Sequence, residues 1–237
     1  MWTALLVFIL IIFGWSAFKC HQAHVANWGN RWLNTIDGLN RLFCKYIHGL
    51  EYNAPFALSE HQGAVVMANH SSGLDAMLLI ATSPRPLRFL ISHEQYERFG
   101  LQWFFRIIGC IPVNLKHKPE RALKPALQAL QNGEVIALFP QGGLTLPHES
   151  KKLKKGGFWL AEQAKCPIYP SIISGINGEG SIMGSIFFHR SQAKITTFPP
   201  IQCPDYKCLE TLQPFFEKKM TWEQIKPSLI ETTKTEQ

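Results

Sequence analysis

The chain has 237 residues, a length typical of one domain that buries a substantial hydrophobic core. Its 24 Lys and Arg residues outnumber 17 Asp and Glu residues, and the net charge of +7 suits nucleic acid, anionic lipid or a phosphorylated substrate. No zinc-finger spacing, arginine-rich stripe or RNA-binding aromatic motif is present, whereas the seven Trp are of a type that favours membrane interfaces. The composition therefore favours lipid over nucleic acid.

The six cysteines are scattered and form no C-x-x-C pair. Cys203 and Cys208 lie close together but far from any other pair of potential ligands, so the sequence indicates neither zinc nor another metal. We expect reduced structural thiols in a cytosolic compartment.

The amino terminus carries an apolar run from Ala4 to Phe18 with no charged residue before Lys19. This length is near the lower limit for a transmembrane helix, and a buried core helix is the alternative. A cleaved signal peptide is disfavoured, because no basic residue precedes the run and Ser16–Lys19 is a poor cleavage site. Lys19 and Arg31 follow the run, which predicts a cytoplasmic location for the body of the protein.

The next segment, from Ala26 to Leu50, has apolar residues at helical spacing and polar residues between them. An ordinary helix that packs on the core is one interpretation. We favour an interfacial membrane helix, because two Trp lie on the apolar face and a hydrophobic anchor lies directly upstream. Residues 1–50 are thus predicted to be a membrane anchor and interfacial helix, and residues 51–237 a separate α/β domain.

After Leu50, short apolar runs alternate with helical stretches, which is typical of an α/β domain with a largely parallel sheet flanked by helices. The polar residues 231–237 are expected to fray. The predicted strands are Ala64–Ala68, Leu87–Ile91, Ile111–Val113, Val135–Phe139, Ile168–Ile173 and Ile195–Phe198. The predicted helices are Asp75–Ala81, Glu94–Ile108, Glu120–Gln131, Gly157–Lys165 and one between Tyr206 and Ile230.

The segment Asn69–Asp75, with the sequence NHSSGLD, lies where the first of these strands ends and a helix begins. His70 and Asp75 are five positions apart, so the aspartate can orient the imidazole and stabilise the charge that it gains on taking a proton. A histidine oriented in this way can deprotonate a hydroxyl. The segment therefore predicts a proton-transfer pair.

Three further blocks follow, at Gly109–Asn114 (GCIPVN), Leu138–Gly143 (LFPQGG) and Ile168–Gly175 (IYPSIISG). The first and third blocks of the four lie beyond the carboxyl ends of predicted strands, where active-site loops are expected. In this order, the four blocks resemble those of the glycerolipid O-acyltransferases, the lysophosphatidic acid acyltransferase superfamily. Asn69, His70, Ser72 and Asp75 match the N-H-x-S-x-x-D form in full.

The resemblance implies that His70 is the general base, Asp75 its partner, and a hydroxyl of a lysophospholipid-like acceptor the nucleophile. The acyl donor is then a thioester, acyl-CoA or acyl carrier protein, with no other cofactor and no acyl-enzyme. For Ser71 and Ser72 two roles remain open, capping of the next helix or stabilisation of an oxyanion through backbone N–H groups. The resemblance also implies a substrate-binding set of Asn114, Gln141, Gly142, Gly143 and Lys154.

The chain departs from the family where the acceptor is usually bound. The third block usually reads F-P-E-G-T-R, and here Gln141, Gly143 and Leu144 replace its Glu, Thr and Arg. The second block usually ends in Arg, where this chain has Leu115. Both arginines that grip a phosphate are absent, and a lysine does not reproduce their bidentate contact.

These replacements predict an acceptor other than lysophosphatidic acid, although Lys151–Lys155 offers positive charge and Lys154 is the favoured phosphate contact. A catalytically inactive lipid-binding or scaffolding homologue is the alternative, and a hydrolase is disfavoured because no G-x-S-x-G elbow occurs. We expect an enzyme of phospholipid biosynthesis in a bacterial inner membrane, with its catalytic domain on the cytoplasmic side.

Overall fold

The centre of the computed structural model is a seven-stranded sheet with the order β1-β7-β6-β2-β5-β3-β4. Every neighbouring pair is parallel except β6 and β7. The structure describes residues 2–97, 100, 102–114, 119–146, 149–203, 206 and 208–234. The strands are β1 Glu51–Tyr52, β2 Ala64–Ala68, β3 Leu87–Ser92, β4 Ile111–Val113, β5 Val135–Leu138, β6 Ile168–Ser174 and β7 Lys194–Thr197.

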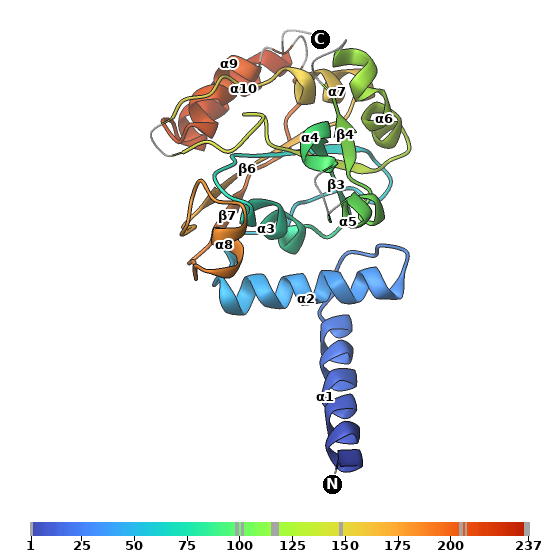
Figure 1. The fold of residues 1–237 in the computed structure, drawn as a ribbon. Coiled ribbons are helices and arrows are strands. Elements are labelled where there is room, and N and C mark those ends of the chain that lie inside the picture. Colours follow the sequence, from blue (N-terminus) through green and yellow to red (C-terminus); the bar gives the residue numbers. More distant parts are fainter. Residues whose placement is uncertain are drawn as a thin grey trace.

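Helices cover both faces of the sheet; of the two at the amino terminus, the second lies across the body and the first projects away from it (Figure 1). The helices are α1 Trp2–Gln22, α2 Arg31–Ile47, α3 Leu74–Thr82, α4 His93–Tyr96, α5 Gln102–Ile107, α6 Pro119–Gln131, α7 Gly156–Ala164, α8 Met183–Phe187, α9 Cys208–Phe216 and α10 Trp222–Lys234.

Alternate residues of the central strands point into two different hydrophobic cores, as the pleat of a sheet requires. In β2, Val65 and Met67 pack with buried residues of α6, α7, α9 and α10. Ala64, Val66 and Ala68 pack with residues of α2, α3, α4, α5 and α8 instead. Because β2 is buried on both faces, its sequence is a continuous apolar run without alternation.

The predicted α/β class and mostly parallel sheet are confirmed, and the six predicted strands lie within one residue of those observed. The two-residue strand β1 and the five-residue helix α8 were not predicted, because neither is long enough to show a period.

Two predicted helices are each replaced by a pair of shorter ones. The predicted helix Glu94–Ile108 is wrong, since α4 ends at Tyr96 and α5 begins at Gln102, with Gly100 at a φ of 83° between them. The predicted tail helix is α9 and α10, separated by a turn in which Lys218 has a φ of 58°. Residues in left-handed conformations interrupt both segments.

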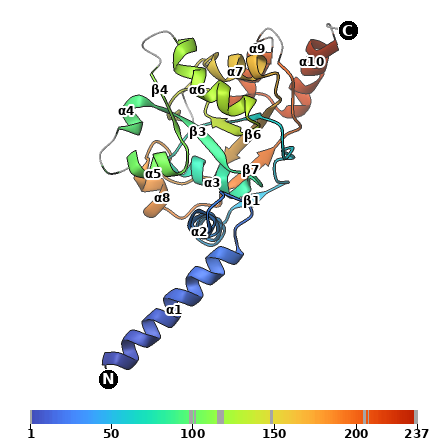
Figure 2. The same ribbon diagram turned by 90° about the vertical axis from the view of Figure 1, so that its right-hand side faces the viewer.

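Helix α1 projects away from the body of the protein (Figures 1 and 2). Its Leu5–Gln22 window has a mean hydropathy of 1.6 and no buried residue, so it is long and apolar enough to cross a membrane. Helix α2 crosses it so closely that a side chain at Gly38 would collide with the carbonyl oxygen of Cys20. These observations argue against the alternative of a buried core helix.

Helix α2 packs on the body through buried polar residues together with Cys44, and it turns several large apolar side chains outward. Asp37 is buried and accepts from Arg41 Nε at 2.7 Å. Arg41 also donates to the carbonyls of Ala81 and Ser83, at the end of α3. The exposed residues include Trp32, Leu39 and Tyr46, which are seven positions apart and therefore lie on one side of the helix. The helix thus packs on the core through Phe43 and Cys44 and leaves other large apolar residues of the same stripe exposed, so each of the two interpretations holds for part of the stripe.

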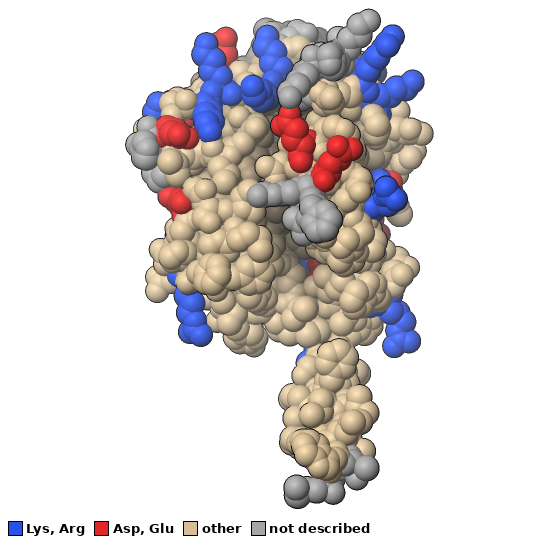
Figure 3. Space-filling view, viewed as in Figure 1, with Lys and Arg blue, Asp and Glu red and all other residues tan. Residues whose placement is uncertain are grey.

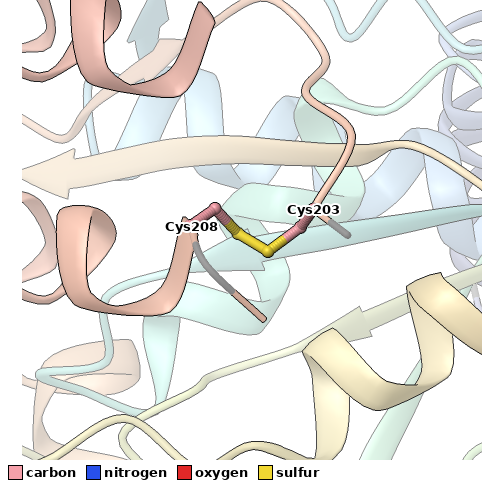
Figure 4. The surroundings of a disulfide bond; sticks show 2 residues. All are labelled: Cys203 and Cys208. Atoms are coloured by element: carbon pink, nitrogen blue, oxygen red, sulfur yellow. A yellow bond between two sulfur atoms is a disulfide. The ribbon is translucent and has the colours of Figure 1, made fainter. Parts of the chain in front are cut away.

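Cys208, the first residue of α9, forms a disulfide with Cys203, which precedes the helix by five residues (Figure 4). The expectation that all six thiols are reduced is wrong for this pair, because their Cα atoms lie 5.4 Å apart, within the range that a disulfide bridges. The other four cysteines are free.

Candidate active site

The predicted proton-transfer pair lies in a turn between the end of β2 and the start of α3, residues 69–75, which we call the catalytic turn. Asn69 ties this turn to the neighbouring strand β6. Its side-chain amide donates to the carbonyl of Ile173 at 3.0 Å, and its oxygen accepts from the Ile173 N–H at 2.7 Å. A side chain thus continues the hydrogen bonding of the sheet one residue beyond β2.

His70 and Asp75 are in direct contact, with 2.8 Å between His70 Nδ1 and Asp75 Oδ2. Asp75 is fully buried, while the His70 side chain is 19% exposed. When Nδ1 donates its proton to the carboxylate, the lone pair of Nε2 remains available to take a proton from another molecule. The turn therefore has the arrangement that a histidine general base requires.

Three other hydrogen bonds hold the Asp75 carboxylate. The backbone N–H groups of Ser71 and Ser72 donate to Oδ2 at 2.7 and 2.9 Å, and the Ser72 hydroxyl donates to Oδ1 at 3.1 Å. The Ser72 Oγ also accepts from the Leu74 N–H at the start of α3. These contacts support the capping role for Ser72. The two N–H groups point at Asp75, so the oxyanion role for them is wrong in this structure.

Residues after β5 close over the catalytic turn. The Phe139 ring stacks on the His70 ring, with centroids 3.9 Å apart and planes within 7° of parallel. The Thr145 N–H donates to the His70 carbonyl at 2.7 Å. Phe139 belongs to the third sequence block, but nothing in its spacing predicts a contact with the histidine.

The structure also brings Gln141, Gly142 and Lys154 together in the loop that follows. Gly142 has a φ of 73°, and a Cβ added there would lie 3.1 Å from Lys154 Cε. The Lys154 N–H donates to the carbonyl of Pro140 at 2.7 Å. Gln141 is 6% exposed, and its Oε1 accepts no hydrogen bond from any described residue.

The other predicted site residues are less closely grouped. Gly143 is half-buried beside this turn, and the carbonyl of Leu144 accepts from Lys151 Nζ. Asn114 follows β4 at the edge of the sheet, three strand spacings from β2, or about 14 Å. Leu115 lies outside the described residues.

The segment after β6 also reaches the catalytic turn, which the sequence did not indicate. The Gly180 N–H donates to the Ser71 carbonyl at 2.7 Å, and the Gly73 N–H donates to the Ser181 carbonyl at 3.1 Å. A side chain at Gly73 would collide with the carbonyl oxygen of Ile182. Only long-range packing places these residues together, so no local pattern could have shown it.

Known proteins resemble this chain in sequence and in fold. Residues 46–174 match the model of a family described as Acyltransferase. The 1-acyl-sn-glycerol-3-phosphate acyltransferase of Bacillus subtilis is 23% identical over 63% of this chain and 72% of its own length. The probable 1-acyl-sn-glycerol-3-phosphate acyltransferase of Mycoplasma pneumoniae is 29% identical, over 49% of this chain and 46% of its own length.

A solved structure has the same fold over nearly the whole chain. It is the crystal structure of the 1-acyl-sn-glycerophosphate (LPA) acyltransferase PlsC from Thermotoga maritima, with a TM-score of 0.58. The match covers 98% of this chain and 93% of that one, at 18% identity. The family match spans 129 of 237 residues, includes β2, β5 and β6, and contains the whole catalytic turn. The chain belongs to the acyltransferase family and is an enzyme of the lysophosphatidic acid acyltransferase-like superfamily.

Proposed function

We propose that this enzyme transfers a fatty acyl group from an acyl thioester to a hydroxyl of a lysophospholipid-like acceptor. His70 Nε2 takes the hydroxyl proton as the oxygen attacks the thioester carbonyl. The carbon–sulfur bond then breaks, and the proton passes from the imidazolium to the thiolate that leaves. Asp75 holds the ring in the required tautomer and stabilises the imidazolium. Acyl-CoA and acyl carrier protein are both donors with this chemistry.

One observation carries the proposal: His70 Nδ1 lies 2.8 Å from a carboxylate oxygen of Asp75. Asp75 is fully buried, while the His70 side chain remains partly exposed. An inactive lipid-binding homologue has no need of such a pair. The site involves no metal in this proposal, and the described residues hold no group of three or more His, Cys, Asp or Glu side chains placed to bind one.

Replacement of His70 by Ala tests the base, with a radiolabelled acyl thioester and a lysophospholipid acceptor as substrates. We expect a loss of about 10²–10⁴-fold in the rate, the usual contribution of a general base. His93→Ala is the matched control, because His93 lies on α4 with an exposed side chain paired to Glu97. A His70→Ala enzyme that keeps more than a few per cent of the activity contradicts the assignment. A wild-type chain that binds lipid without any transfer indicates the inactive homologue.

We further propose that the acceptor is not lysophosphatidic acid but a lysophospholipid with a larger head group, a glycolipid or an amino lipid. The support is the loop after β5, where a neutral amide and an aliphatic side chain replace a carboxylate and a guanidinium. The buried Gln141 Oε1 without a partner among the described residues suits a head group that brings its own hydroxyl or amino donor. Leu144 presents nothing that grips a phosphate monoester.

Acylation rates measured with a panel of acceptors test this proposal, for the wild-type chain and for one double variant. The wild-type chain is expected to prefer at least one of these three classes, and a sharp preference for lysophosphatidic acid contradicts the proposal. The double substitution Gln141→Glu and Leu144→Arg restores the two charged residues that are usual in the third block. It should raise the relative use of lysophosphatidic acid by about tenfold or more, since a charge-assisted bidentate contact is worth about 1.5–3 kcal/mol.

We also propose that α1 spans a bacterial inner membrane, that α2 lies at its surface, and that the body is cytoplasmic. The charge pattern around α1 and the outward apolar side of α2 support this arrangement. The disulfide weighs against a cytoplasmic body, because such bonds are rare in reducing compartments. Protease added to spheroplasts that make the full chain should leave the body intact, and its digestion would place the body outside.

A further inference from the structure

Two short helices of the catalytic domain carry large apolar side chains that no part of the described protein covers. Phe187 and Phe188, at the end of α8, are 63% and 81% exposed, and Trp103 on α5 is 60% exposed. Soluble surfaces seldom gather such side chains without an interaction to account for them. We call this set the α5–α8 surface; its members are Trp103, Ile107, Ile182, Met183, Phe187 and Phe188.

This surface adjoins the outward side of α2. Figure 2 shows α5 and α8 beside α2, on the side of the body toward which α1 extends. His48, directly after α2, is buried and its Nε2 donates to the carbonyl of Ile186 on α8 at 3.1 Å. Helix α8 is therefore bonded to the end of α2, and α5 lies farther along the same side of the body.

The residues that lead into α8, 180–182, contact the catalytic turn. The two backbone hydrogen bonds donated by Gly180 and Gly73 connect Gly180 to Ser71 and Ser181 to Gly73. The close approach of Gly73 to the Ile182 carbonyl leaves no room between them. An interaction that holds α8 in place therefore also holds the catalytic turn, because residues 180–182 connect the two.

The charges around this face suit a phospholipid surface. In Figure 3 the lower part of the visible face, above α1, is largely uncharged, while Lys and Arg gather at its sides and at the opposite end. Next to Phe188, His189 and Arg190 are exposed. Aromatic rings followed by basic groups match a bilayer interface, where rings lie among the head groups and cations lie near phosphates.

We propose that the α5–α8 surface inserts into the head-group region of the phospholipid bilayer and holds the catalytic turn at the membrane surface. The inference rests on the proposed attachment through α1 and α2, and extends it to the catalytic domain itself. An acceptor with its acyl chain in the bilayer then meets His70 without leaving the lipid.

A fluorescent label at position 188 tests the proposal without any need for activity. The full chain, with Cys20 replaced by Ser, carries either Phe188→Cys or Met220→Cys and is labelled with an environment-sensitive maleimide. Met220 is a suitable control, because it is an exposed apolar residue between α9 and α10, on the side of the body away from α1 (Figure 1). The free thiols of Cys44, Cys110 and Cys166 are buried, and burial raises their pKa to about 12, 12 and 11, so they do not compete for the label.

The labelled chains are reconstituted in phosphatidylcholine–phosphatidylglycerol vesicles that contain lipids with a nitroxide near the top of the acyl chain. Interfacial side chains lie about 5–10 Å below the head groups, so the label at 188 should be blue-shifted and quenched, and the label at 220 neither. Equal behaviour at both positions overturns the proposal. A label at 188 that is shielded from water without nitroxide quenching indicates a second protein copy, and also overturns it.

Activity provides a second readout. Phe187→Ser with Phe188→Ser should reduce transfer to a lysolipid in the vesicle by about tenfold, because two rings no longer hold the domain on the bilayer. Transfer to a short-chain acceptor that is monomeric in water should be unchanged, as should both reactions of Met220→Ser. Equal losses on both acceptors overturn the proposal. If the wild-type chain transfers to neither acceptor, the proposed function fails, whereas the quenching result still decides the membrane contact.

Discussion

His70 and Asp75 belong to a turn whose key hydrogen bonds join residues at most five positions apart, whereas Gln141, Gly142 and Lys154 meet across a longer loop. In the turn, both carboxylate oxygens of Asp75 accept hydrogen bonds. In the loop, the buried amide oxygen of Gln141 accepts no hydrogen bond from a described residue. The catalytic turn is thus complete within the protein, while the loop is suited to a group that the substrate supplies.

The difference indicates which part of the enzyme tolerates change. Alteration of the turn breaks several interactions at once and should affect every acceptor equally. Alteration of the loop should affect acceptors differently, because each one brings other polar groups.

Asp75→Asn should have the largest effect, a loss of about 10²–10⁴-fold in the turnover with every acceptor. The amide cannot both accept from His70 and keep the bonds from Ser71, Ser72 and the Ser72 hydroxyl. Initial rates across the acceptor panel measure it. Ser72→Ala is the graded comparison, since it removes one hydrogen bond of about 1 kcal/mol and keeps the carboxylate. A loss confined to one acceptor would remove the contrast between the two regions.

Gly73→Ala should lower turnover by about tenfold and destabilise the fold by about 1–3 kcal/mol, because its methyl group meets the backbone of Ile182. Rates and a thermal melt of the full chain report the two effects. Gly14→Ala is the control, as nothing lies within 4 Å of a side chain placed there. A variant with normal rate and stability would show that α8 and the turn move independently.

Lys154→Ala should raise KM for the phosphate-bearing substrate by about tenfold and leave kcat nearly unchanged, as expected when a charge contributes about 1.4 kcal/mol to binding alone. Its side chain crosses Gly142 beside the site. The exposed neighbour Lys152 supplies the control, Lys152→Ala, with the same change of charge. Identical kinetics of the two variants would assign the lysines to general surface charge.

Cys203→Ser should leave the kinetics unchanged and lower stability by about 2 kcal/mol, the loop-closure entropy of so short a ring. Both sulfurs pack with α6, α7 and α9, on the face of the sheet opposite α3. The melting temperature should fall by about 4–8 °C for a domain of this size. Chemical reduction of the wild-type chain should reproduce this shift, and a change in acceptor preference would show that the disulfide acts on the site.

Local signals in the sequence predicted the features that depend on local structure. The apolar run Ala64–Ala68 and the motif after it predicted β2 and the position of His70 and Asp75, because a strand end and a helix start need only neighbouring residues. The contact of Phe139 with His70 was not predicted, since it depends on the pairing of β2 with β5.

Other features escaped prediction because tertiary structure decides them. Helix α2 was expected to have two faces with the apolar one toward a membrane, but its sequence cannot show that Arg41 binds the carbonyls at the end of α3. The same holds for α8, which has five residues and no period, and for Gly180 and Ser181 just before it, which make two backbone hydrogen bonds with the catalytic turn. The Cys203–Cys208 pair was misjudged because spacing does not reveal whether two thiols face each other.

The close crossing of α1 and α2 at Gly38 has a mechanical consequence. Because backbone meets backbone there, the angle between the two helices cannot adjust through side-chain rearrangement. The 18-residue apolar window of α1 is about 27 Å long, slightly less than a typical bilayer core. In the proposed membrane arrangement, any tilt that hydrophobic mismatch imposes on α1 passes directly to the catalytic domain. The reaction rate would then depend on the thickness of the bilayer.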